Sequence, residues 1–161
     1  MNASTEIENA VRAFTVPGTP IGKARARVVQ DQRGRSHSYT PEKTALYEKL
    51  VHDCYVFQHP GKPALAGPVA IRVTAYMPIP KSWPRSKKGA ALAELIKPTV
   101  KPDASNILKG IEDGLNGAAY EDDKQIVYAT IEKKYGADPR AEVELWNLPE
   151  TEEVRQNDDA V

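Results

Sequence analysis

Residues 101–123 concentrate side chains that can act together in chemistry. Several carboxylates, an amide and an amine stand out in this segment: Asp103, Asn106, Lys109, Asp113, Asp122 and Asp123. Mg²⁺ prefers oxygen ligands and takes only one or two carboxylates, with waters and phosphate oxygens completing its shell. This mixture therefore predicts a site that holds a hard divalent cation next to a phosphate, which is the chemistry of a metal-dependent nuclease.

A helix from residue 103 to about 116, ending at Gly117, would gather most of these groups on one face. At about 100° per residue, a polar arc lies beside Asp103 and an apolar arc lies opposite. The polar arc contains Asn106, Lys109, Gly110 and Asp113, and the apolar arc contains Ile107, Leu108, Ile111 and Leu115. Asp103 would lie at the N-terminus, where the free N–H groups and the helix dipole favour an anion. Gly110 would allow a backbone or a ligand to approach closely.

Each of these residues also has an ordinary structural explanation. Asp103 suits a helix N-cap, and Lys109 with Asp113 can form an i,i+4 pair on a solvated face. Asp122 and Asp123 can be turn acids before a strand. Their combination favours the metal site, because two adjacent aspartates repel each other and a cation relieves that repulsion.

The remaining chain predicts the elements that must position this segment. Thr40, Pro41 and Glu42 have the character of a helix start, with threonine as the N-cap. That helix should run to about residue 57 with a buried stripe made of Leu46, Leu50, Val51, Cys54 and Phe57. Strands are expected at 11–16, 68–77, 125–135 and 141–148, the last two as a hairpin, with a short helix at 86–96 and a basic loop at 22–38.

The order strand, helix, strand, helix, strand, strand predicts an α+β fold, in which helices pack on one face of a small mixed β-sheet. The chain has 161 residues, which suits one domain, expected at 11–149. A flexible N-terminus at 1–10 and an acidic, disordered tail at 150–161 are expected to flank it. The single cysteine fits a reducing cytosol, and no apolar run approaches the length of a membrane span.

Net charge is zero, so any polyanion must be recognised by a local patch. The predicted phosphate-binding residues are Lys23, Arg25, Arg27, Arg33, Arg35 and Lys81. A solvated basic loop without a ligand is the alternative for each. The sequence contains no GxxxxGK[ST] loop, so no nucleotide cofactor is expected.

These motifs resemble the RusA family of Holliday-junction endonucleases, especially its phage and prophage members. The resemblance rests on KPDxxNxxKxxxDxLNG at 101–117 and DDxQIV at 122–127. Weaker similarity is carried by GKARAR at 22–27, YTP at 39–41 and YMPIPKSW at 76–83, and the whole spans about 13–148.

The resemblance implies a RusA-like fold and a homodimer of the bacterial cytoplasm. It implies binding of four-way DNA junctions during recombination and repair, and paired nicks made with Mg²⁺ or Mn²⁺. Asp103 and Asp123 would match metal-binding aspartates, with Asp122 beside them, and Lys109 would match a catalytic lysine. Asn106 and Asp113 are expected as further metal ligands. One position departs from the family: Ser105 stands where many members have aspartate. Either Asp113 or Asp122 supplies that charge, or metal binding is weaker, or this branch is inactive.

Three other functions remain open. One is a nuclease acting on flaps or forks, and a second is a non-catalytic protein that binds branched DNA. The third, a small enzyme acting on a phosphorylated metabolite, is disfavoured because the phosphate loop is missing.

Overall fold

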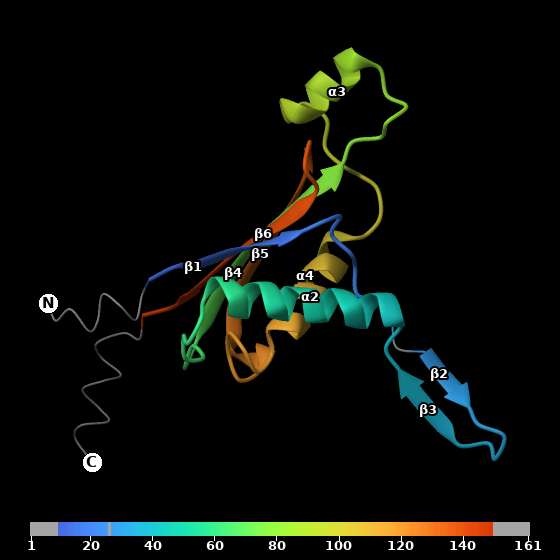
Figure 1. Ribbon diagram of the computed structural model, residues 1–161, viewed down its shortest axis with the longest axis vertical. Helices are drawn as coiled ribbons and strands as arrows, with labels where there is room; N and C mark the ends of the chain where they lie inside the picture. The colour runs from blue at the N-terminus through green and yellow to red at the C-terminus, as the bar shows by residue number, and fades with distance from the viewer. Residues whose placement is uncertain (1–9, 26, 150–161) are drawn as a thin grey trace, which may run out of the picture.

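The computed structural model describes residues 10–25 and 27–149, and it shows an α+β architecture (Figure 1). Its elements are β1 (Arg12–Pro17), β2 (Arg27–Gln30), β3 (Ser36–Tyr39), α2 (Glu42–Gln58), β4 (Val69–Pro78), α3 (Arg85–Leu92), α4 (Ala104–Leu115), the 3₁₀ helix η1 (Asp123–Gln125), β5 (Ile126–Gly136) and β6 (Arg140–Asn147). The expected loose N-terminus and acidic tail fall mainly on 1–9 and 150–161, which lie outside the described residues. Within the described part, no helix is both long and apolar enough to cross a membrane.

Four strands form a mixed sheet in the order β1-β6-β4-β5, and α2 and α4 lie on one of its faces (Figure 1). Strand β4 runs parallel to β5 and antiparallel to β6, which in turn pairs antiparallel with β1. The predicted fold class is therefore confirmed.

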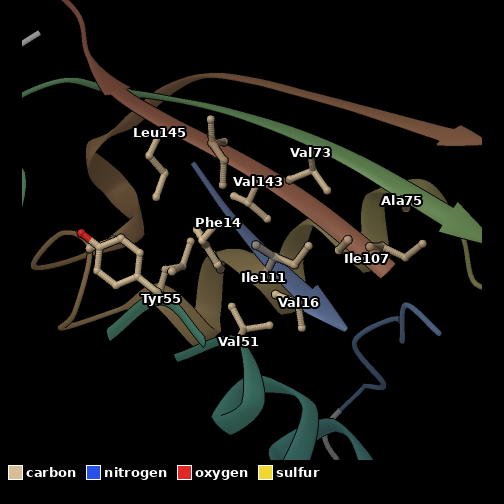
Figure 2. Close-up of a cluster of buried hydrophobic side chains, with 14 of the residues drawn as sticks. Phe14, Val16, Val51, Tyr55, Val73, Ala75, Ile107, Ile111, Val143 and Leu145 are labelled. Carbon is tan, nitrogen blue, oxygen red and sulfur yellow. The ribbon is translucent and has the colours of Figure 1, made fainter. Parts of the chain in front are cut away.

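The core fills the space between this sheet face and the two helices (Figure 2). Strand β4 supplies alternate buried residues, including Ile71 and Val73, as its period-two pattern predicted. Helix α4 supplies Ile107, Ile111 and Leu115, which are fully buried. The apolar face of α4 is thereby anchored to the sheet, and its polar face is left toward solvent.

The predicted extent of α2 is within a residue of the observed one, but its N-cap and most of its predicted buried stripe were wrong. Pro41, not Thr40, is the N-cap, because the Pro41 carbonyl accepts the first helical bonds from the N–H groups of Thr44 and Ala45. The buried positions are Thr44, Tyr47, Val51 and Tyr55, whereas Leu46 is 61% and Phe57 is 85% exposed, Leu50 is exposed, and Cys54 is half-buried. Apolar residues occur all round this helix, so their spacing did not single out one face.

Tyrosines take the core positions on α2 because each combines a large apolar ring with a polar tip. The ring of Tyr55 packs edge-on against Phe14 at 5.4 Å between centroids. Its hydroxyl accepts a hydrogen bond of 2.8 Å from Nη1 of Arg12. Burial raises the pKa of Tyr47 to about 12.

Strands β5 and β6 were predicted as a hairpin, and this was also wrong, because β4 lies between them. The three residues 137–139 carry the chain over the end of β4. Gly136 pairs with Pro78, and the guanidinium of Arg140 stacks 3.9 Å from the ring centroid of Tyr76. The apolar β4 takes the sheet centre, while the charged β5 suits an edge.

The basic loop forms a separate two-stranded sheet, in which β2 pairs antiparallel with β3. Figure 1 shows this hairpin projecting beyond the N-terminal end of α2, away from the four-stranded sheet. Helix α3 lies at the opposite end of the molecule, past the end of β4.

Candidate active site

Helix α4 presents the predicted chemical face. It begins at Ala104, with Asp103 as N-cap, and ends at Leu115 before Gly117, whose φ of 76° suits glycine. The Asp103 side chain makes no capping hydrogen bond. Helix capping, the simplest explanation for an aspartate at this position, therefore does not engage its carboxylate. Asp103, Ser105, Asn106 and Lys109 are exposed, which places them on the solvent side of the helix.

Acids and lysines alternate across this face to form a chain of ion pairs. Nζ of Lys109 contacts Oδ1 of Asp113 at 3.1 Å and also bonds to Oδ2 of Asp123. On its other side, Asp113 bonds through Oδ2 to Lys23, whose Nζ lies 3.0 Å from Oε1 of Glu48. Lys109 thus lies between one acid of its own helix and one acid of the following turn.

The burial of the acids strengthens these pairs. The side chains of Asp113 and Asp123 are only 15% and 24% exposed, and a partly buried charge needs a partner. Hydrogen bonding to Asp123, and then to Asp113, raises the pKa of Lys109 above its ordinary value. Partial burial lowers the pKa of Lys23, but its bonds to Asp113 and Glu48 outweigh this and raise it overall. Both lysines therefore remain charged at neutral pH.

The acidic turn is held by a capping box around η1. Oδ1 of Asp122 accepts from the N–H of Lys124 at 2.8 Å, and Oε1 of Gln125 accepts from the N–H of Asp122 at 3.3 Å. The Gln125 amide also donates to the carbonyls of Leu65 and Gly67. Asp122 therefore shapes the turn, while the neighbouring Asp123 reaches across to Lys109.

A strap formed by residues 21–23 lies across α4 and brings Lys23 into the site. The N–H of Lys23 donates to the carbonyl of Asn106 at 2.9 Å. A Cβ on Gly22 would lie 2.7 Å from Cβ of Pro102, so only glycine fits there. A Cβ on Gly110 would lie 3.7 Å from the backbone of Ile21 and Lys23. A backbone does pass over Gly110, as predicted, but at a distance that would also accommodate a Cβ.

The donor set suits a hard cation. Asp113 and Asp123 already converge on one positive charge, the ammonium of Lys109, which shows that their carboxylates can share a cation. Asp103, Asp122 and Asn106 are nearby in sequence. Each adds a side-chain oxygen, the ligand atom that Mg²⁺ prefers. Among residues 10–25 and 27–149, no three His, Cys, Asp or Glu side chains are already grouped as a metal site.

The predicted phosphate-binding residues lie in three different places. Lys23 is part of the ion-pair chain, so its charge is already paired with the carboxylates of Asp113 and Glu48. Arg25 is exposed, Arg27 begins β2, and Arg33 and Arg35 lie at the exposed tip of the β2–β3 hairpin. Lys81 lies in the connection between β4 and α3, and α3 is at the opposite end of the molecule from the hairpin (Figure 1).

Sequence reasoning missed two residues that build the site. Gln125 had a local signal, because Asp-x-x-Gln is a capping-box pattern. Glu48 had none: it meets Lys23 only because α2 crosses α4 at Gly114, where a Cβ would lie 2.7 Å from the Glu48 carbonyl oxygen.

The α+β scaffold thus presents aspartates and a lysine on one face of α4, and these are groups suited to chemistry on a phosphate. Residues 17–146 match the family described as "Endodeoxyribonuclease RusA". The chain therefore belongs to the RusA family of endodeoxyribonucleases. It is also similar to a Bacillus subtilis (strain 168) protein described as "Uncharacterized protein YqaN", with 39% identity over 132 residues that cover 81% of this chain and 92% of that protein.

Proposed function

We propose that this protein resolves four-way DNA junctions by metal-dependent, paired nicking. One observation carries the proposal: Lys109 is held between Asp113 and Asp123 on the solvent face of α4, whose N-cap is Asp103. Together with membership of an endodeoxyribonuclease family, this arrangement supports hydrolysis of a DNA phosphodiester.

The residues of this face have distinct roles in that reaction. Asp103 and Asp123 would hold the metal, with Asp122, Asp113 and Asn106 as further ligands. Held by these residues, Mg²⁺ or Mn²⁺ would make hydroxide available near neutral pH and would polarise the phosphate. Lys109 keeps its proton and donates to a phosphate oxygen as negative charge develops there. The first N–H groups of α4 are at the N-terminal end of the helix, beside Asp103, and they favour the binding of a phosphate there.

Lys23 and Gln125 position these groups. Lys23 bonds to Asp113 from the side opposite Lys109, which gives that partly buried carboxylate a second cationic partner. Gln125 fixes the acidic turn against the 65–67 loop, so that Asp123 faces α4.

Two symmetric nicks require two copies of the site, so we propose that the protein acts as a homodimer on the junction. The exposed arginines near the β2–β3 hairpin would contact phosphates and orient the DNA arms. Sedimentation of the protein, free and with a junction, measures this directly. A monomer on the junction would leave paired nicking without a physical basis.

Cleavage of a synthetic four-way junction by wild type, Asp103→Asn and Asp123→Asn tests the function. We expect paired nicks by wild type with Mg²⁺ or Mn²⁺ and none with EDTA. Each variant should lose cleavage by at least about 100-fold while keeping junction affinity, since the loss removes charge stabilisation of the transition state. Asp138→Asn, in the exposed turn between β5 and β6, is the matched control and should cleave normally.

The other candidate functions predict different results. A flap or fork nuclease would cut those substrates faster than the four-way junction. A non-catalytic binding protein, in which Ser105 marks lost activity, would give no nicks with either metal. Equal loss of binding and cleavage in both variants would show that the aspartates serve folding instead.

A further inference from the structure

A cavity of about 790 Å³ lies beside the candidate active site. Its walls come from the β1–β2 connection (17–24), the first turns of α2, and residues 101 and 102. The volume falls within the range of about 300–1,000 Å³ that is usual for small-ligand pockets. None of the roles described above for residues 10–25 and 27–149 uses this cavity.

The cavity and the candidate site share a wall. Pro102 lines the cavity and directly precedes Asp103, the N-cap of α4. Gly22, another lining residue, packs against Pro102 and Asn106. A molecule in the cavity would therefore contact Pro102, the residue directly before the proposed metal ligand Asp103. A group attached to that molecule could extend to the α4 face.

The lining chemistry favours a flat apolar ring that carries an anion. Pro20, Pro41 and Pro102 offer rigid apolar surfaces. Lys43 and Lys101 are exposed lining residues, and no aspartate or glutamate is among the residues that line the cavity. An apolar interior with cations at its mouth is complementary to a nucleobase joined to its phosphate.

We propose that this cavity receives one unstacked nucleobase of the branched DNA, with Lys43 and Lys101 on the adjoining phosphates. The proposal rests on the proposed function and specifies how the same site selects its substrate. Bases at a branch point are cheaper to unstack than bases inside a duplex. The cavity would therefore favour branched DNA over linear duplex and would hold the strand beside Asp103.

A cavity-filling variant combined with an abasic nucleotide tests this directly. Ala24 lines the cavity, and its exposed methyl can be enlarged while its N–H keeps the 3.2 Å bond to Oγ1 of Thr44. In EDTA, an abasic nucleotide next to the branch should weaken junction binding by wild type about fivefold or more. Ala24→Leu should bind the intact junction equally weakly and should not respond to the abasic site. Ala137→Leu, in the exposed β5–β6 turn, is the matched control and should behave as wild type.

The outcomes separate this proposal from the proposed function. If wild type cuts junctions but ignores the abasic site, or if Ala24→Leu still responds to it, the base pocket is wrong and the nuclease assignment stands. A titration with deoxynucleoside monophosphates, followed by the amide resonances of Gly18, Gly22 and Ala24, probes the cavity even if no junction is cut. Shifts in wild type that vanish in Ala24→Leu support the pocket, and their absence at millimolar nucleotide overturns it.

Discussion

In the proposed reaction, the ammonium of Lys109 lies where a metal ion would meet the carboxylates of Asp113 and Asp123. Its ammonium neutralises Asp113 and Asp123, both largely buried, and Lys23 supplies a second positive charge to Asp113. Without metal, the lysines relieve the repulsion between the acids. We infer that metal binding competes with Lys109 for these oxygens, which frees the lysine to meet a phosphate.

Replacing Lys109 with methionine should separate these two roles. Loss of the competing ammonium should tighten Mg²⁺ or Mn²⁺ binding severalfold, while cleavage should fall about 100-fold because a transition-state donor is lost. Calorimetric titration of the metal and single-turnover cleavage measure the two effects. Lys62→Met, at an exposed position in the loop after α2, should change neither. Weaker metal binding in Lys109→Met would show that the lysine supports the metal site instead.

The packing of α4 against α2 depends on one glycine. A Cβ at Gly114 would lie 2.7 Å from the Glu48 carbonyl oxygen and 2.9 Å from Cβ of Val51, and neither atom can move away without shifting α2. Gly114→Ala should therefore lower the free energy of unfolding by about 1–3 kcal/mol. Urea denaturation measures the loss, and cleavage should fall as Glu48 moves away from Lys23.

Gly110→Ala is the control on the same helix. Its Cβ would meet backbone atoms of the strap only at ordinary contact distances of 3.7 Å. Because alanine favours a helix by about 1 kcal/mol over glycine, this variant should be as stable as wild type or slightly more stable. A loss as large as that of Gly114→Ala would mean that the strap, and not the crossing of α2, limits the space around α4.

The hairpin turn is organised by Asp31. Its Oδ1 accepts from the N–H groups of Arg33 at 2.8 Å and Arg35 at 2.9 Å. The bond from Arg35 and, to a smaller extent, the bond from Arg33 lower the pKa of Asp31 below its ordinary value of 3.8. A lowered pKa in the folded protein means that the stabilisation is complete above pH 3.8 and is lost as the pH falls through the folded value.

The amide resonances of Arg33 and Arg35 should therefore titrate together, with a midpoint below 3.8. An NMR pH titration measures this, and Asp31→Asn should abolish the shared transition. A midpoint at or above 3.8 would contradict the role of Asp31 in shaping the tip that presents the two arginines.

At the scale of the molecule, total charge cannot drive DNA binding, because 22 basic residues balance 22 acidic ones. Affinity must depend on where the cations lie, and the hairpin carries several of them away from the sheet (Figure 1). Arg33→Ala should remove about one phosphate contact. The slope of the logarithm of the junction-binding constant against the logarithm of salt concentration should then become shallower by about 0.9. Binding measured over a series of salt concentrations tests this. Lys62→Ala removes an exposed charge at the other end of α2 and should leave the slope unchanged.

Much of the fold was predictable because its signals are local. Strand β4 and helix α4 each show a clear period and clear end signals, so both were placed within a residue or two. Helix α2 has apolar residues on every side, and its tyrosines, not its leucines, are buried. The non-adjacency of β5 and β6 depends on β4 taking the sheet centre, which no short-range pattern encodes.

The amino-acid sequence by itself determined the chemistry of the site: which acids and which lysine are present, and that one helix carries most of them. Only the tertiary structure decided that Lys23 and Glu48 join them, that Asp123 meets Lys109, and that a cavity opens beside Asp103. The physical reason is that helix and strand periods act over a few residues. Ion pairs between distant segments arise only where packing of the core, through Gly114 and the strap at 21–23, brings those segments together.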